Sequence, residues 1–142
     1  MAANYRFIEH TADIACEVSG DTLEELFTAS VEAWRSSVVE ETMYCNREIK
    51  KFKLKASSKE QLLVDFISEL NFKLFARNWL FNLVIILEIK QKNDTWILST
   101  EIEGMPVSQD VEIKQEIKAI TFHQMNIEKR EDQYHTPIVF DI

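Results

Sequence analysis

Two short apolar segments, one near each end of the chain, carry a single acidic residue each. They are His10–Ile14 (HTADI) and Phe140–Ile142 (FDI). The alternation of a β-strand turns Asp13 and Asp141 away from their apolar neighbours. If the two strands pair, the fold closes by joining its beginning to its end, and two carboxylates share one place. Two carboxylates so near each other repel unless a cation lies between them, so the pairing predicts a metal site.

Two stretches have the periodicity of amphipathic helices. Asp21-Thr22-Leu23-Glu24 is typical of a helix start with an Asp cap, and we expect a helix from about Thr22 to Val39 with Trp34 in the core. Ser57 or Ser58 caps a second helix. The apolar side chains at helical spacing are Leu23, Leu26, Phe27, Val31 and Trp34, then Leu63, Phe66, Ile67, Leu70 and Leu74.

Most of the remaining chain alternates as β-strands do. The expected strands cover Tyr5–Ile8, Ala12–Val18 up to Gly20, Glu48–Ala56, Asn82–Lys90, Thr95–Glu103, one bent strand or two within Val111–Glu128, and a final strand after Pro137. Residues 91–94 read as a hairpin loop, and Gly104-Met105-Pro106 reads as a turn. The order ββαβα followed by several antiparallel strands predicts an α+β fold, with two helices packed on one face of a mixed or antiparallel sheet.

Composition narrows the function classes. The 142 residues predict one domain over 1–142, and the formal net charge of −8 argues against strong direct binding of nucleic acid. The two glycines lie far apart, which excludes a Gly-rich phosphate loop. Trp79–Leu87 is too short to span a membrane. Cys16 and Cys45 lack metal-type spacing, and the start of the chain resembles no signal peptide, so we expect a reduced, cytoplasmic protein without a membrane partner.

The residues permit two interpretations of the acidic pair. Asp13, Asp141 and a backbone or terminal oxygen of Ile142 form a plausible half-shell for a hard cation such as Ca²⁺ or Mg²⁺. The alternative is two unrelated carboxylates at the rim of a sheet. His10 and His123 invite the same question, because two histidines with a nearby Asp can transfer protons, yet buried structural histidines are more common.

Two further carboxylates lie four residues apart on the second expected helix. Asp65 and Glu69 repel each other weakly at that spacing, and Glu69 can pair with Lys73. A solvated helix face is the simpler interpretation, and a part for either residue in the site stays open.

Several segments together resemble the archease family. These are HTADI at 10–14 with GDTLEELF at 20–27, LLVDFISEL at 62–70, EIKAITFH at 116–123 and IVFDI at 138–142. They occur across the whole chain in the order and spacing of the family. Phe66 and Phe122 stand where the family often has Trp and Tyr, which conserves packing, and residues 107–112 match less clearly.

The resemblance implies a function. Archease is an accessory protein of the RtcB-type RNA ligase, and it promotes metal-dependent guanylylation of the ligase histidine by GTP, which permits multiple turnover in tRNA splicing and RNA repair. By this resemblance the protein is a non-enzymatic activator whose metal site is Asp13, Asp141 and Ile142, with Ca²⁺ the expected ion and Mg²⁺ or Mn²⁺ as alternatives. His10, Lys118 and His123 are supporting or partner-facing candidates.

Two other functions stay open at this stage. One is a general, chaperone-like protein modulator, which predicts exposed apolar surface. The other is a small metal-dependent hydrolase that uses Asp13, Asp141 and His123.

Overall fold

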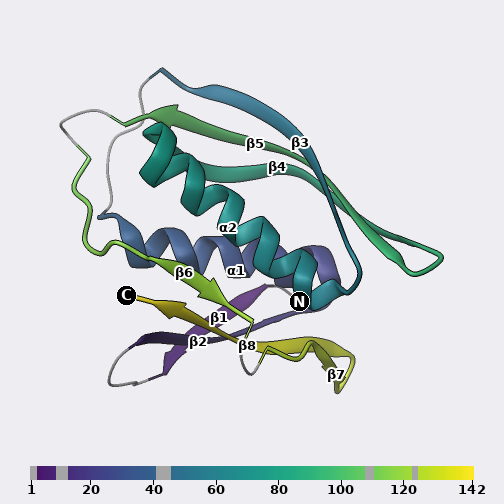
Figure 1. The fold of residues 1–142 in the computed structure, drawn as a ribbon. Helices are drawn as coiled ribbons and strands as arrows, with labels where there is room; N and C mark the ends of the chain where they lie inside the picture. The colour runs from purple at the N-terminus through teal and green to yellow at the C-terminus, as the bar shows by residue number, and fades with distance from the viewer. Residues whose placement is uncertain (1–2, 9–12, 41–45, 108–110, 123–124) are drawn as a thin grey trace.

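Two helices lie between two antiparallel β-sheets, which gives the molecule three layers (Figure 1). This arrangement comes from a computed structural model that describes residues 3–8, 13–40, 46–107, 111–122 and 125–142. Both helices contact both sheets. The apolar stripe of each helix is therefore covered on two sides.

The first sheet joins the two ends of the chain. Its strands follow the order β1-β2-β8-β6, and β7 also pairs with β8. The strands are β1 (Asn4–Ile8), β2 (Asp13–Gly20), β6 (Ala119–Thr121), β7 (Glu128–Arg130) and β8 (Gln133–Asp141).

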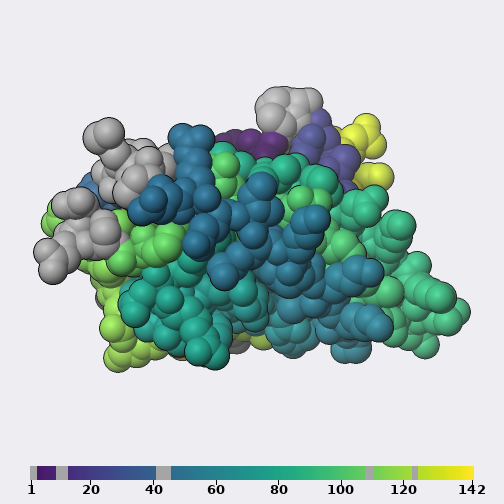
Figure 2. Space-filling view, turned by 90° about the horizontal axis from the view of Figure 1, so that it is seen from above, coloured from purple at the N-terminus to yellow at the C-terminus, as the bar shows by residue number. Residues whose placement is uncertain are grey.

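The second sheet has the order β3-β5-β4 and consists of β3 (Glu48–Ala56), β4 (Trp79–Lys92) and β5 (Thr95–Pro106). Lys92 pairs with Thr95, so the predicted hairpin is confirmed with a two-residue loop. Figure 2 looks onto this side of the molecule, where β3 is blue and the β4–β5 hairpin is green at one end. Figure 1 shows that this hairpin extends beyond both helices. The projecting hairpin leaves part of this sheet without a helix against it.

Local capping sets the start of each helix. In α1 (Leu23–Val38), the Thr22 hydroxyl accepts from the Glu25 N–H at 3.1 Å, and a Glu25 oxygen accepts from the Asp21 N–H at 2.8 Å. Thr22 is thus the cap, whereas Asp21 was expected. The backbone N–H of Asp21 instead donates to the Glu25 side chain. In α2 (Lys59–Arg77), Ser58 accepts from the Gln61 N–H. Neither described helix has the length and apolarity of a membrane crossing.

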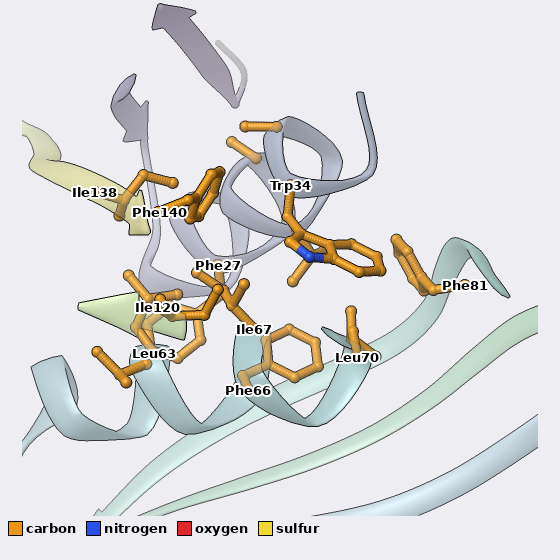
Figure 3. Packing of buried hydrophobic residues seen from close by; sticks show 14 of the residues in the cluster. Phe27, Trp34, Leu63, Phe66, Ile67, Leu70, Phe81, Ile120, Ile138 and Phe140 are labelled. Atoms are coloured by element: carbon orange, nitrogen blue, oxygen red, sulfur yellow. The ribbon is translucent and has the colours of Figure 1, made fainter. Parts of the chain in front are cut away.

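The core lies where the helices meet both sheets. Trp34 is fully buried, as predicted, and its indole N–H donates to the side-chain Oδ1 of Asn71 at 2.9 Å, which ties α1 to α2. Figure 3 shows the surrounding side chains, which come from α1 (Phe27), α2 (Leu63, Phe66, Ile67, Leu70), β4 (Phe81), β6 (Ile120) and β8 (Ile138, Phe140).

The α+β class is confirmed, and three details differ from the sequence prediction. The strands form two sheets, whereas one sheet with both helices on one face was expected. Gly104 lies within β5 and does not form the expected turn. A Cβ at this position would lie 2.4 Å from the Trp79 ring and the Leu80 carbonyl, so glycine is what allows β4 to approach β5 this closely. Within 111–128, the described residues form only β6, one isolated bridge at Ile113 and the start of β7.

Candidate metal site

The register of β2 and β8 places Asp13 directly opposite Asp141. Residues directly opposite each other in an antiparallel pair share a face, with Cβ atoms about 5 Å apart. The predicted joining of the two chain ends is therefore confirmed, and it brings the two carboxylates into one place.

β6 places a third residue beside the two aspartates, and the three form a row across the sheet. Ala119 pairs with Asp141, so Asp13, Asp141 and Ala119 follow one another across three strands. The Lys118 N–H donates to the Asp141 carbonyl at 2.8 Å. This bond holds the backbone of Lys118, an exposed residue, beside the acidic pair (Figure 1 shows the end of β8 next to the start of β6).

The row faces away from the helices. On the opposite face of the same strands, Ile14 pairs with Phe140, which is fully buried in the core. Strand alternation therefore points Asp13 and Asp141 outward. Asp13 is half-buried, whereas Asp141 and Ile142 are exposed, so a cation or a partner can reach them.

The donors present fit a hard divalent cation. Two carboxylates from adjacent strands supply oxygen ligands, and the backbone oxygen of Ile142 follows immediately in the chain. Among the residues that the structure describes, no group of three or more His, Cys, Asp or Glu side chains could hold a metal. A cation here would thus depend on main-chain or terminal oxygen, water or a partner to complete its shell.

The other candidate residues separate into two groups. His10 and His123 lie outside the described residues. Asp65 accepts a hydrogen bond from the Gln61 amide at 2.8 Å, and Glu69 forms the predicted ion pair with Lys73 at 2.8 Å. Asp65 and Glu69 therefore each have a partner on their own helix.

Comparison with known proteins identifies the family. The sequence model of the archease protein family (MTH1598/TM1083) matches residues 5–142. The chain belongs to the archease family. Curated archeases resemble it throughout: that of Pyrobaculum calidifontis is 32% identical over 141 residues, covering 99% of this chain and 96% of the relative, and that of Methanosarcina barkeri is 27% identical over 139 residues, covering 97% and 95%.

Solved structures of the family share the fold. Protein 1598 of Methanobacterium thermoautotrophicum superposes with a TM-score of 0.76 at 24% identity, covering 97% of this chain and 98% of its own. The Thermotoga maritima structure, described as an archease and possible chaperone, has a TM-score of 0.63 at 27% identity and covers 95% and 94%. The likeness to the first structure concerns the fold alone.

Proposed function

We propose that this archease family member is a non-enzymatic activator of an RtcB-type RNA ligase. In this role it promotes metal-dependent guanylylation of the ligase histidine by GTP, and so supports multiple turnover in tRNA splicing and RNA repair. The observation that carries the proposal is the Asp13–Asp141 pair, which β2 and β8 present on an exposed face.

Asp13, Asp141 and an oxygen of Ile142 would hold the cation, with Ca²⁺ expected and Mg²⁺ or Mn²⁺ as alternatives. A bound divalent cation supplies positive charge that neutralises phosphate oxygens. The chain's own contribution is to orient the carboxylates through the β2–β8 ladder and to keep Lys118 beside them through its backbone bond to Asp141.

Charge supports a protein partner. The net charge of −8 disfavours direct binding to RNA but complements a ligase surface that must be basic to hold RNA and GTP. Activation also requires that the protein bind the guanylylation-competent conformation of the ligase more tightly than other conformations.

One observation favours a second function. Leu83, Ile85 and Ile86 are exposed on β4, an edge strand of the second sheet. Exposed apolar residues of this kind suit a general, chaperone-like modulator of other proteins. This alternative predicts that the acidic pair contributes little, which the test below measures.

The proposal is tested by the formation of the ligase–GMP adduct from GTP, with and without this protein. We expect wild type to stimulate adduct formation, and Asp13→Ala and Asp141→Ala to lose most of the stimulation because each removes a cation ligand. Asp65→Ala, which changes a carboxylate on α2, is the matched control and should stimulate as wild type does.

The outcomes separate the candidate functions. Stimulation that survives in both folded variants would remove the cation from the mechanism. If wild type gives no stimulation, the ligase proposal fails; protection of unrelated proteins from aggregation by wild type and both variants alike would then support the general modulator.

A further inference from the structure

A polar pocket lies at the end of α1, and its volume is about 410 Å³. Small-molecule sites in proteins have volumes of roughly 300–1,000 Å³, so the pocket is large enough for a small ligand. The described residues of its lining come from β1, α1 and the residues after it, β4, and the segment before β6. They include neither aspartate of the candidate metal site, so a ligand in this pocket requires neither a cation nor a ligase.

A β-bulge turns Asn82 toward α1 and this pocket. The register of β4 against β5 shifts between Phe81 and Leu83, so Asn82 is the extra residue of the bulge. In a regular strand its side chain would point away from the side on which Phe81 is buried. Asn82 is instead only 8% exposed and lines the pocket. Bulges are common where a strand re-aims a side chain at a functional site.

The amide of Asn82 has a donor that nothing satisfies. Its Oδ1 accepts from an Nη of Arg35 at 3.2 Å, and the Nε of Arg35 donates to the Phe81 carbonyl at 2.8 Å. These bonds fix the orientation of the amide, because the reverse orientation would turn Nδ2 toward the guanidinium donors. Nδ2 is buried and has no hydrogen-bond partner among the described residues. A buried donor without an acceptor costs free energy, so this amide favours an occupant that carries an acceptor oxygen.

Charged groups of both signs surround the mouth of the pocket. Glu32, Glu40 and Lys114 line it, and all three are exposed. The Lys114 N–H donates to the Val38 carbonyl at 2.8 Å. The Glu40 N–H donates to the Glu112 carbonyl at 3.3 Å, so backbone bonds hold both residues in place. Within the described part of the chain, none of the three charged side chains has an ion-pair partner.

Glu32 favours a positive group beside it. Desolvation raises the pKa of its carboxyl, although the residue as a whole is exposed. An ammonium group next to the carboxylate would offset this cost of desolvation. Arg35 and Ser36 follow Glu32 by three and four residues, so the three lie on one face of α1. The acidic side of the mouth is therefore on the same helix face as the Arg35–Asn82 pair.

We propose that this pocket binds a small zwitterion of the α-amino-acid class. The carboxylate of the ligand accepts from the Asn82 amide and lies toward Lys114, while its ammonium group lies toward Glu32 and Glu40. A simple anion would leave the two carboxylates without a partner, and a simple cation would leave the amide donor and the lysine without one. The occupant that complements both sets of groups carries both charges on one small frame.

The first test follows the side-chain amide signals of Asn82 by heteronuclear NMR of the whole protein, assigned through its backbone. Each of the common L-amino acids is added at about 10 mM, a concentration that detects dissociation constants into the millimolar range. We expect at least one of them to shift the Asn82 signals in a saturable way and to raise the melting temperature. Its N-acetyl derivative lacks the ammonium charge and its amide lacks the carboxylate, so each should bind more weakly by about tenfold or more.

Two substitutions separate the two ends of the ligand. Asn82→Asp keeps the oxygen that accepts from Arg35 and replaces the N–H donors by a carboxylate, so binding of the amino acid should fall by about tenfold or more. Glu32→Gln keeps the shape of the side chain and removes its charge. It should weaken binding of the amino acid but not of its N-acetyl derivative. Asn93→Asp, in the β4–β5 hairpin loop outside the pocket, is the matched control and should bind as wild type does.

The results decide between a zwitterion site and a site filled by water. Saturable shifts that both derivatives and both pocket variants weaken support the proposal. If no amino acid shifts the Asn82 signals, only water meets the amide and the proposal is overturned. Equal binding of the N-acetyl derivative, saturable binding of guanosine in place of amino acids, or binding that Asn82→Asp leaves unchanged also overturns it. If Asn82→Asp does not fold, the derivatives and Glu32→Gln still decide.

Discussion

Cys16 shows how a single residue is governed by burial. It lies on the core face of β2 with no exposed surface, and burial raises the pKa of its thiol from 9.0 to about 11. Its thiol donates a weak hydrogen bond to the Glu17 backbone carbonyl, with 3.8 Å between Sγ and O. The thiol is thus protonated at neutral pH and behaves as a small apolar side chain.

We expect Cys16 to resist iodoacetamide in the folded protein and to react quickly in denaturant. The experiment uses a Cys45→Ser background and counts labelled thiols by mass spectrometry. Because the folded pKa is raised, the native thiol keeps its proton at a pH where the unfolded thiol loses it. Stability from this group is complete below pH 9 and is lost as the pH rises toward about 11.

Denaturant unfolding at about pH 8 and about pH 10 checks this sign, with Cys16→Ala as the control that lacks the titration. Cys16→Ala should lose less stability over this interval than the parent protein. Equal labelling of folded and unfolded protein would contradict the burial argument.

The turn of the β7–β8 hairpin has a backbone conformation that its two residues disfavour. Arg130 pairs with Gln133, and the two residues between them have positive φ angles, 51° at Glu131 and 65° at Asp132. Two successive left-handed residues form the turn that favours Asn-Gly. Glu131 is poorly suited to this backbone, so the tertiary structure holds the turn in a conformation that its residues disfavour.

Replacing the turn with Glu131→Asn and Asp132→Gly should stabilise the protein by about 1 kcal/mol, because both residues then suit the left-handed region. Urea unfolding measures the change. Asp94→Gly is the matched control. Asp94 lies in the β4–β5 hairpin loop, where Asn93 has a positive φ of 57° and Asp94 does not, so glycine at position 94 should be neutral or destabilising. A stabilising Asp94→Gly would show that the gain does not come from turn geometry.

At the scale of the whole molecule, the fold is closed by its two ends. β2 pairs with β8 from Asp13–Asp141 at one end of the ladder to Gly20–Tyr134 at the other. A ligand held by Asp13 and Asp141 therefore binds only when the start and the end of the chain are together. Cation binding and folding are expected to be linked.

Ca²⁺ should raise the melting temperature relative to EDTA, with a stabilisation of about 2.7 kcal/mol when free Ca²⁺ is a hundredfold above its dissociation constant. Asp141→Asn should lose most of this shift, and in EDTA it should melt no lower than wild type because the repulsion between the carboxylates is gone. Asp94→Asn, on the projecting hairpin, is the control and should keep the shift. A shift that survives Asp141→Asn would place the cation elsewhere.

Features that depend on near neighbours were predictable from sequence. The span of α1 was predicted to within one residue at each end from its apolar stripe and a polar residue at its start, although the cap is Thr22 and not the expected Asp21. Trp34 in the core, the Glu69–Lys73 pair and the β4–β5 hairpin arise in the same way. Alternation also predicted which way Asp13 and Asp141 point, and their similar segments suggested that they pair. Whether they bind a cation remains a prediction.

Features that depend on distant partners needed the tertiary structure. Backbone hydrogen-bonding groups are the same in every strand, so alternation does not say which strands pair, and two sheets enclose the helices where one was expected. Gly104 also depends on a distant partner. Its sequence context is typical of a turn, but in the structure it lets β4 approach β5. The exposed Phe72 has the pattern of any other apolar residue of α2, and only the tertiary structure shows that it lines a groove between α2 and residues 116–120. Local order thus follows from short-range interactions in the sequence, whereas the choice of strand partners depends on the packing of the whole chain.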